Sequence, residues 1–288
     1  MTMATLESTT RGDLVRDTAH HGGNTNFGRV LRSEFIKFSS VPSTLVLVLC
    51  TVLVMVGFAA LNAWAIGTFF EAAANNPEMG SAAGEVEGAA DSVAAGGVIF
   101  AQLIVGSLAV LVMSSEYATG MARATYAAVP KRHPVFLAKA LLVAFVAFLV
   151  AAVSILIAFV VIKPITTNYG IPLDFASEGF QRSLWLSAVY VAAIGLIGFS
   201  LGSLLRNSAG GIVTLAGLTF VLPIAFSLLP GEFWAKAIRF IPDAAYSNLL
   251  AAQTAPDALE KWQSALVLGA WVLVPLTVAG IVAQRRDI

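Results

Sequence analysis

Long uninterrupted apolar stretches are the main pattern of this 288-residue chain. A helix needs about 20 apolar residues to cross the hydrocarbon core of a bilayer. Six stretches of that length contain no Asp, Glu, Lys or Arg: Thr44–Gly67, Val93–Met113, Ala140–Ile162, Leu184–Leu205, Ala209–Leu229 and Ser264–Ala283. Alternating segments of about ten residues, the pattern of a membrane β-barrel, are absent. The pattern therefore predicts an all-α integral membrane protein with six transmembrane helices.

The composition supports this prediction. Hydrophobic residues make up 58% of the chain and charged residues 12%, and the mean hydropathy is +0.82. A water-soluble domain normally carries about 25% charged residues, because part of its surface must face water. These values exclude a soluble enzyme, a nucleic-acid-binding protein and a secreted disulfide scaffold. The one cysteine, Cys50, lies inside the first apolar stretch and forms no intrachain disulfide.

Basic residues are distributed unevenly between the segments that join the apolar stretches. If the N-terminus lies inside, 12 of the 17 Lys and Arg residues fall inside, whereas Thr68–Ser92 outside has none. Since basic residues gather on the cytoplasmic side, we predict a multi-pass protein of the cell membrane with both termini cytoplasmic. Residues 1–26 are polar and typical of a disordered tail. Their two histidines, His20 and His21, fall short of the three or four ligands of a metal site, so no metal is expected.

Residues 27–42 precede the first apolar stretch and are predicted to form an amphipathic helix in the membrane interface. Arg29 and Arg32 lie on its polar face, and Pro42 ends it. The apolar face consists of Phe27, Val30, Leu31, Phe35 and Phe38. Glu34 falls near the middle of that apolar face. Either the carboxylate snorkels or the helix is rotated, or this face packs on the bundle and Glu34 meets a cation or free backbone amides. The candidate cations are Arg123, Lys139 and Arg206.

The second inside segment reads SSEYATGMARATYAAVPKRHP over Ser114–Pro134. Glu116, Gly120 and Arg123 are spaced for a helical continuation of the second span into the cytoplasm. Pro130 and Pro134 then mark a return, with two basic residues between them. The segment is longer than a tight hairpin needs. The alternative interpretation is a basic loop that only sets the topology.

Several smaller features concern helix packing. The fourth and fifth spans are joined only by Arg206–Ser208, which predicts a tight antiparallel hairpin. Gly198 and Gly202 form a small-residue face that serves packing within the chain or a subunit interface. Pro223 is expected to kink the fifth span. The last outside segment, Pro230–Gln263, has the spacing of two short helices.

The sequence lacks the motifs of the common energy-converting and hydrolytic sites. It contains no G-x-x-x-x-G-K-[ST] and no H-E-x-x-H, and no catalytic residues are predicted. Secondary carriers usually keep intramembrane carboxylates or histidines for coupling, and the six stretches hold none. The function left by these exclusions is a translocation pathway that has no energy source of its own.

Two motifs in the chain resemble the permease subunits of ATP-binding-cassette exporters of the ABC-2 type, particularly the small actinobacterial form. The first motif is LRSEFIKFSSVPS before the first span, and the second is SSEYATGMARATYAAVPKRHPVFLAK between the second and third spans. The matching positions in the second motif are Glu116, Gly120, Arg123, Pro130, Arg132 and Lys139. The resemblance covers roughly Phe27 to the C-terminus, and the six-span plan agrees with it.

The resemblance implies a fold, partners and roles for residues. The fold would be that of an ABC-2, type V exporter-like permease. Residues 27–42 would be its connecting helix with Glu34 as a pin, and residues 43–288 its six-helix transmembrane domain. Two such subunits, identical or homologous, would assemble with two ATPase subunits, which would bind ATP and magnesium, so this chain needs no cofactor of its own. The residues that would contact the ATPase are Glu116, Tyr117, Gly120, Arg123, Pro130, Lys131 and Arg132. A pathway between the second and fifth spans of the two copies would place Phe100, Gln102, Phe220 and Phe226 near the substrate.

The function expected from the resemblance is therefore ATP-driven export of a hydrophobic or amphipathic substrate such as a drug, lipid or peptide. Two alternatives remain open. One is a channel or secondary carrier that is not coupled to ATP, and the other is a membrane anchor that transports nothing. A partner with a P-loop ATPase motif would distinguish the first function from both.

Overall fold

The computed structural model describes residues 26–75, 90–121, 132–255 and 257–285. Within these ranges the chain forms helices and no strand. Six of the described helices are long and apolar enough to cross a membrane. The all-α fold with six transmembrane helices is therefore confirmed.

The spanning helices are longer than the apolar stretches that predict them. At 1.5 Å per residue, the third span is about 55 Å long, whereas the hydrocarbon core measures about 30 Å. Hydropathy marks only the part of a helix at hydrocarbon depth, and the backbone stays helical into the interface. The spans are α3 (Pro42–Ala74), α5 (Val98–Ala118), α7 (Arg132–Asn168), α8 (Glu178–Leu205), α9 (Ser208–Ala216) with α10 (Leu222–Leu228), and α13 (Lys261–Arg285).

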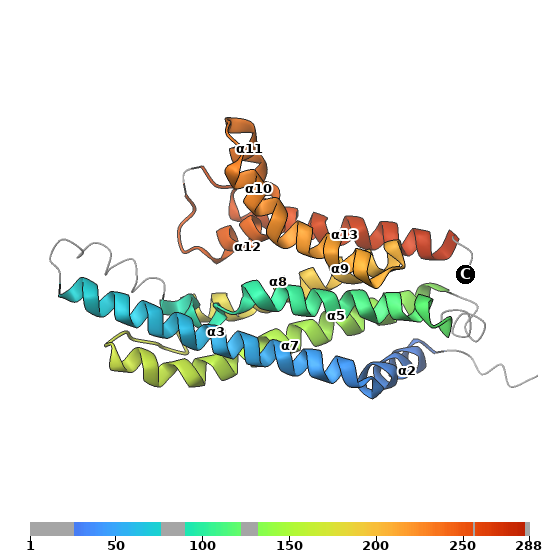
Figure 1. Cartoon of the computed structure of the whole chain (residues 1–288), viewed down its shortest axis with the longest axis horizontal. Helices are drawn as coiled ribbons and strands as arrows, with labels where there is room; N and C mark the ends of the chain where they lie inside the picture. Colours follow the sequence, from blue (N-terminus) through green and yellow to red (C-terminus); the bar gives the residue numbers. More distant parts are fainter. Residues whose placement is uncertain (1–25, 76–89, 122–131, 256, 286–288) are drawn as a thin grey trace, which may run out of the picture.

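The helices α3, α5, α7 and α8 run side by side in the bundle, and α13 packs against α8 (Figure 1). The short 3₁₀ helix η2 (Ala90–Ala95) leads into α5. Helices α5 and α8 approach closely at the two glycines of the small-residue face. A methyl group added at Gly198 would overlap the backbone of Gly106, and one at Gly202 would overlap that of Val110. The small-residue face therefore serves packing within the chain.

The fifth span is not a continuous α-helix. A π-helical turn, η3 (Gly217–Val221), separates α9 from α10, and Pro223 lies in the first turn of α10. Proline lacks a backbone N–H and crowds the preceding turn, so it favours such a break. Figure 1 shows the chain changing direction there, with α10 and α11 (Glu232–Ala237) projecting from the side of the bundle. The kink predicted at Pro223 is present.

The connection between α10 and α13 contains the short helices predicted from its sequence. After α11, a 3₁₀ turn η4 (Ile238–Phe240) leads into α12 (Pro242–Leu250). Helix α12 packs on α13 and α8, and Trp271 of α13 donates a 2.7 Å hydrogen bond to the carbonyl of Phe240. These contacts fold the connection back onto the bundle.

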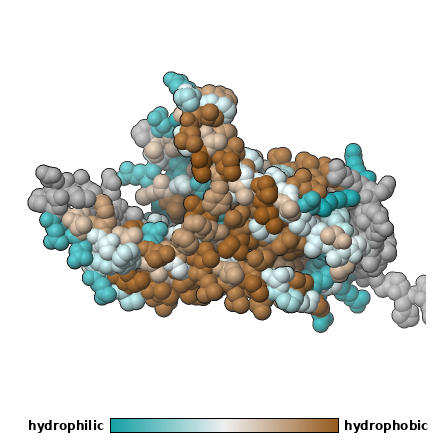
Figure 2. Space-filling view, in the orientation of Figure 1, coloured by the Kyte–Doolittle hydropathy of each residue, from teal (hydrophilic) through white to brown (hydrophobic). Residues whose placement is uncertain are grey.

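The amphipathic segment is α2 (Phe27–Ser40), and it lies across one end of the bundle (Figure 1). Val41 is extended and Pro42 occupies the first turn of α3, as expected for the residue before a proline. We call this end of the bundle the α2 end. The end of α5, the start of α7, the α8–α9 turn and the end of α13 also lie there. Figure 2 shows apolar residues filling the middle of the long axis and hydrophilic residues toward its ends, as for a membrane-spanning bundle.

Candidate functional site

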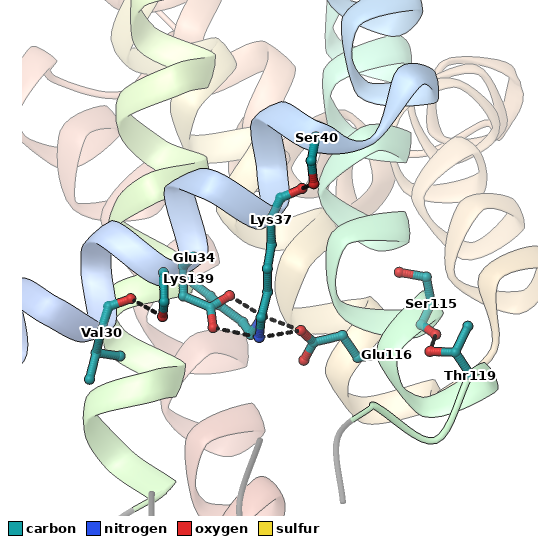
Figure 3. Close-up of polar contacts among 9 residues, drawn as sticks. Val30, Glu34, Lys37, Ser40, Ser115, Glu116, Thr119 and Lys139 are labelled. Atoms are coloured by element: carbon teal, nitrogen blue, oxygen red, sulfur yellow. Dashed lines mark hydrogen bonds and ion pairs between the residues drawn. The ribbon is translucent and has the colours of Figure 1, made fainter. Parts of the chain in front are cut away.

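Four charged side chains from three helices meet at the α2 end (Figure 3). Glu34 and Lys37 lie one turn apart on α2. Glu116 comes from the last turn of α5, and Lys139 from the second turn of α7. We call these four residues the ion-pair cluster. It joins the interfacial helix to two spans that are distant from it in the sequence.

The ammonium group of Lys139 lies between the two carboxylates. It donates hydrogen bonds to Glu34 Oε2 and, at 2.6 Å, to Glu116 Oε1. Lys37 donates to Glu34 Oε1 at 3.0 Å and makes a longer contact of 3.5 Å with Glu116 Oε1. Each carboxylate is therefore paired with both ammonium groups. The cluster holds two negative and two positive charges.

Three members of the cluster are buried. The side chains of Glu34 and Lys139 are each 3% exposed and that of Glu116 10%, whereas Lys37 is 33% exposed. Removing charges from water costs several kcal/mol per ion unless each charge is paired and hydrogen-bonded. Burial acts to lower the pKa of Lys37, but its hydrogen bond to Glu34 and the charges of Glu116 and Glu34 outweigh burial and raise that pKa. Lys37 therefore keeps its positive charge at neutral pH.

The orientation of α2 decides between the two interpretations of Glu34. Glu34 and Val30 are buried, and Val30 packs with Val135 and Ala138 of α7. Lys139 is one of the three cations proposed from the sequence, so the predicted contact is present. Leu31 is partly buried against the same residues of α7, whereas Phe27 and Phe35 of the apolar face are exposed. A helix that crosses another touches it along a narrow stripe, and this stripe includes Glu34.

The last turn of α5 is also attached to the α8–α9 turn. The guanidinium group of Arg206 lies 4.6 Å from the ring centre of Tyr117, and the hydroxyls of Ser114 and Ser208 are 2.8 Å apart. Arg206 adopts a left-handed conformation with φ of 50° at the end of α8. Its N–H donates to the carbonyl of Gly202. The end of α5 thus contacts α2 and α7 on one side and α8 and α9 on the other.

The segment after α5 is described only in part. Thr119 caps α5, and Gly120 follows with φ of 70°, a conformation that glycine adopts without strain. Arg123, Pro130 and Lys131 lie outside the described residues, and Arg132 is the first residue of α7. Of the proposed ATPase contacts, Glu116 and Tyr117 are therefore the side chains whose surroundings are described here. Lys37 was not predicted to belong to this site. It lies three residues after Glu34, a spacing that brings side chains together on one face of a helix.

The four proposed pathway residues have different surroundings in the structure. Phe100 is 38% exposed and stacks on Phe58 with ring centres 3.9 Å apart, whereas Gln102 is fully buried. Two residues apart on a helix, they lie on different faces. Phe220 lies in the π-helical turn, and Phe226 contacts Trp234 of α11. A pathway along the face of Phe100 therefore excludes Gln102 in this conformation.

Gln102 instead belongs to a polar group inside the chain. Tyr190 of α8 donates a 2.7 Å hydrogen bond to Gln102 Oε1. The ring of Tyr190 stacks on that of Tyr246 of α12, with centres 4.2 Å apart, and the Tyr246 hydroxyl lies 2.7 Å from that of Ser187. These contacts attach α12 to the core of the bundle. Among the described residues no cluster of His, Cys, Asp and Glu has the composition of a metal site.

Comparison with protein families matches residues 71–281 to a family described as "ABC-2 family transporter protein". The match begins in the last turns of α3 and ends in α13. It includes Glu116 and Lys139, whereas α2 with Glu34 and Lys37 lies before it. No curated protein matches the chain.

Proposed function

The chain belongs to the ABC-2 transporter family, and we propose that it is the permease subunit of an ATP-driven exporter, coupled to its ATPase at the α2 end. In this proposal two copies, or one copy and a homologue, assemble with two ATPase subunits that bind ATP and magnesium. The complex lies in the cell membrane with both termini of this chain in the cytoplasm. The exported substrate is hydrophobic or amphipathic, and the two sequence motifs favour the small actinobacterial form.

The ion-pair cluster is the observation that best supports coupling at this end. The segment between α5 and α7 begins three residues after Glu116 and ends eight residues before Lys139. A force applied to this segment therefore acts on two helices whose ends are joined through the cluster to α2. Because the pairs are buried and mutually satisfied, moving one helix without the others would separate charges in a poorly solvated place. The three helices are thus expected to move together.

The contacts on the other side of α5 extend this coupling to the fifth span. The Tyr117–Arg206 and Ser114–Ser208 contacts connect the end of α5 to the start of α9. The break at η3 then separates α9 from α10. π-Helical turns are frequent at functional sites, and this one gives α10 freedom to change its angle to α9. A motion that starts at the α5–α7 segment would reach the face of the fifth span in this way.

The proposal is tested by purifying the tagged chain from its native membrane under mild conditions. A protein with a P-loop ATPase motif should co-purify, and the complex should hydrolyse ATP. Reversing the charge at Arg123 or Arg132 should leave membrane insertion intact and lower the amount of ATPase recovered, because charge pairs at interfaces contribute about 1.5–7 kcal/mol of coupling. A fully inserted chain that brings down no ATPase would contradict the proposal and agree with a channel or carrier. Unchanged recovery in both variants would remove the α5–α7 segment from the interface.

A further inference from the structure

A cavity of about 210 Å³ lies beside the ion-pair cluster, between α2, α3, α5 and α7. It is larger than an engineered cavity of about 150 Å³ that accommodates benzene. All four charged residues of the cluster lie along it. Its remaining wall is mostly apolar and includes Leu47, Leu108, Leu111 and Val112. The cavity thus has a charged end and an apolar body, which suits an amphipathic ligand.

The cavity opens at the turn between α2 and α3. Val41 and Ser43 line it and are exposed, as are Ser115 and Met121. Beyond the turn, Val46, Cys50 and Val54 are spaced by four residues on the face of α3 next to Leu47, and Val46 and Cys50 are exposed. Such spacing forms a continuous apolar stripe along a helix. An acyl chain that leaves the cavity can therefore lie along α3, and the amphipathic α2 places the opening at the headgroup level of the membrane.

Two groups along the cavity are suited to a zwitterion. Glu116 Oε1 accepts from both lysines, whereas Oε2 has no hydrogen-bond partner among the described residues and lies outside the contacts drawn in Figure 3. The second group is the start of α3, where Ser43 and Thr44 line the cavity and no side chain caps the helix. Pro42 has no N–H and the Thr44 N–H donates to the carbonyl of Val41, so Ser43 supplies the backbone N–H that, with the helix dipole, favours a phosphate there. A carboxylate oxygen favours an ammonium group.

We propose that this cavity binds the headgroup of a phospholipid with a primary amine, of the phosphatidylethanolamine class. The ammonium group donates to Glu116 Oε2, the phosphate accepts from the N–H of Ser43 in the first turn of α3, and the acyl chains leave along Val46, Cys50 and Val54. A choline headgroup has no N–H to donate, and a glycerol headgroup has no positive charge. The cluster itself is neutral, so neither a purely anionic nor a purely cationic lipid matches it. This inference is independent of any ATPase partner.

The experiment measures the melting temperature of the delipidated full-length chain by tryptophan fluorescence, with three added lipids that share dioleoyl chains. Phosphatidylethanolamine should raise the melting temperature at lower concentration than phosphatidylcholine or phosphatidylglycerol, by about tenfold, which is the effect of one charge-assisted hydrogen bond. Equal responses to the three lipids would overturn the proposal. They would show a cavity occupied by water or by lipid of any class.

Two variants locate the binding. Leu111→Trp fills the cavity away from the charges, and Leu273→Trp adds the same side chain on the exposed face of α13. The response to phosphatidylethanolamine should disappear in the first variant and persist in the second. If Leu111→Trp does not fold, Thr44→Val keeps the volume but removes a hydroxyl near the phosphate, and it should weaken phosphatidylethanolamine several-fold. If the selective response to phosphatidylethanolamine persists in Leu111→Trp, the lipid binds elsewhere and the assignment is overturned. If only Thr44→Val folds, a selective response that persists in Thr44→Val has the same meaning.

Discussion

Lys139 is the residue on which the ion-pair cluster depends most. Its ammonium group contacts both carboxylates and is almost fully buried, whereas Lys37 contacts the same carboxylates from a partly exposed position. A buried ion pair adds little stability compared with apolar residues of the same shape, but the loss of one partner leaves an uncompensated charge. The cluster is therefore better understood as a device that fixes the relative positions of α2, α5 and α7.

The two lysines should differ strongly when each is replaced by methionine, which has a similar length. Lys139→Met leaves two buried carboxylates with one partner and is expected to cost about 3–5 kcal/mol of unfolding free energy. Lys37→Met should cost about 1 kcal/mol or less, since a partly exposed cation contributes less than a buried one. Thermal unfolding followed by tryptophan fluorescence compares the two. Equal losses of unfolding free energy in the two variants would show that Lys139 contributes no more to the cluster than Lys37.

Asp243 gives the second prediction at this scale. It lies in the first turn of α12, and burial raises the pKa of its carboxyl group, although a hydrogen bond with Tyr190 acts to lower it. An acid whose pKa is higher in the folded than in the unfolded state destabilises the fold once it ionises. Stability should therefore fall as the pH rises from about 4 through the folded-state pKa.

Asp243→Asn removes this ionisation. The variant should lose less melting temperature than the wild type between pH 4 and pH 7, and it should be the more stable of the two at pH 7. Asp257→Asn, at an exposed position in the same connection, is the matched control and should leave the slope unchanged. The same slope in Asp243→Asn as in the wild type would show that burial does not affect this carboxyl group.

At the scale of elements, the end of α5 connects the two parts of the proposed coupling route, which are the ion-pair cluster with α2 and α7 and the contacts with the α8–α9 turn. The Tyr117 ring interacts with the Arg206 guanidinium through its face, and the hydroxyl is not needed for that contact. Tyr117→Phe should therefore keep the ATPase rate of the assembled complex, whereas Tyr117→Leu should lose about 0.5–2 kcal/mol of interaction and lower the rate. Arg206→Gln should lower the rate less in the Tyr117→Leu background than in the wild type. Additive effects of the two substitutions would indicate independent roles.

The elements also show what the sequence can predict. The spans followed from their apolar length, because every backbone polar group at hydrocarbon depth must be satisfied within a helix. The contact between Glu34 and Lys139 followed from the cost of a carboxylate on an apolar face. The exposure of Phe35 did not, because it depends on the angle at which α2 crosses α7. The same holds for Gln102, whose burial reflects the rotation of α5 against α8. The apolar pattern of α5 runs around the whole helix and does not fix that rotation.

At the scale of the whole molecule, the first span begins and the last span ends at the α2 end, as an even number of spans requires. Which side of the membrane this end faces is predicted from the distribution of basic residues. In a Cys50→Ala background, a cysteine at Ser81 should react with an impermeant maleimide in intact cells, and one at Ala128 only after permeabilisation. The reverse pattern would place the α2 end outside and remove every contact proposed with a cytoplasmic ATPase.

The central claim is that a separate ATPase acts on this chain at the α2 end, and site-specific photo-crosslinking in the native membrane tests it most directly. A photoreactive phenylalanine at Thr119, the exposed cap of α5, is compared with one at Asn168, the exposed last residue of α7. Helix geometry places Asn168 on the order of 40 Å from Lys139 along α7, at the opposite end of the bundle. Crosslinking to an ATP-binding subunit is predicted from Thr119 and not from Asn168. No such product from Thr119, or an equal product from Asn168, would contradict the claim.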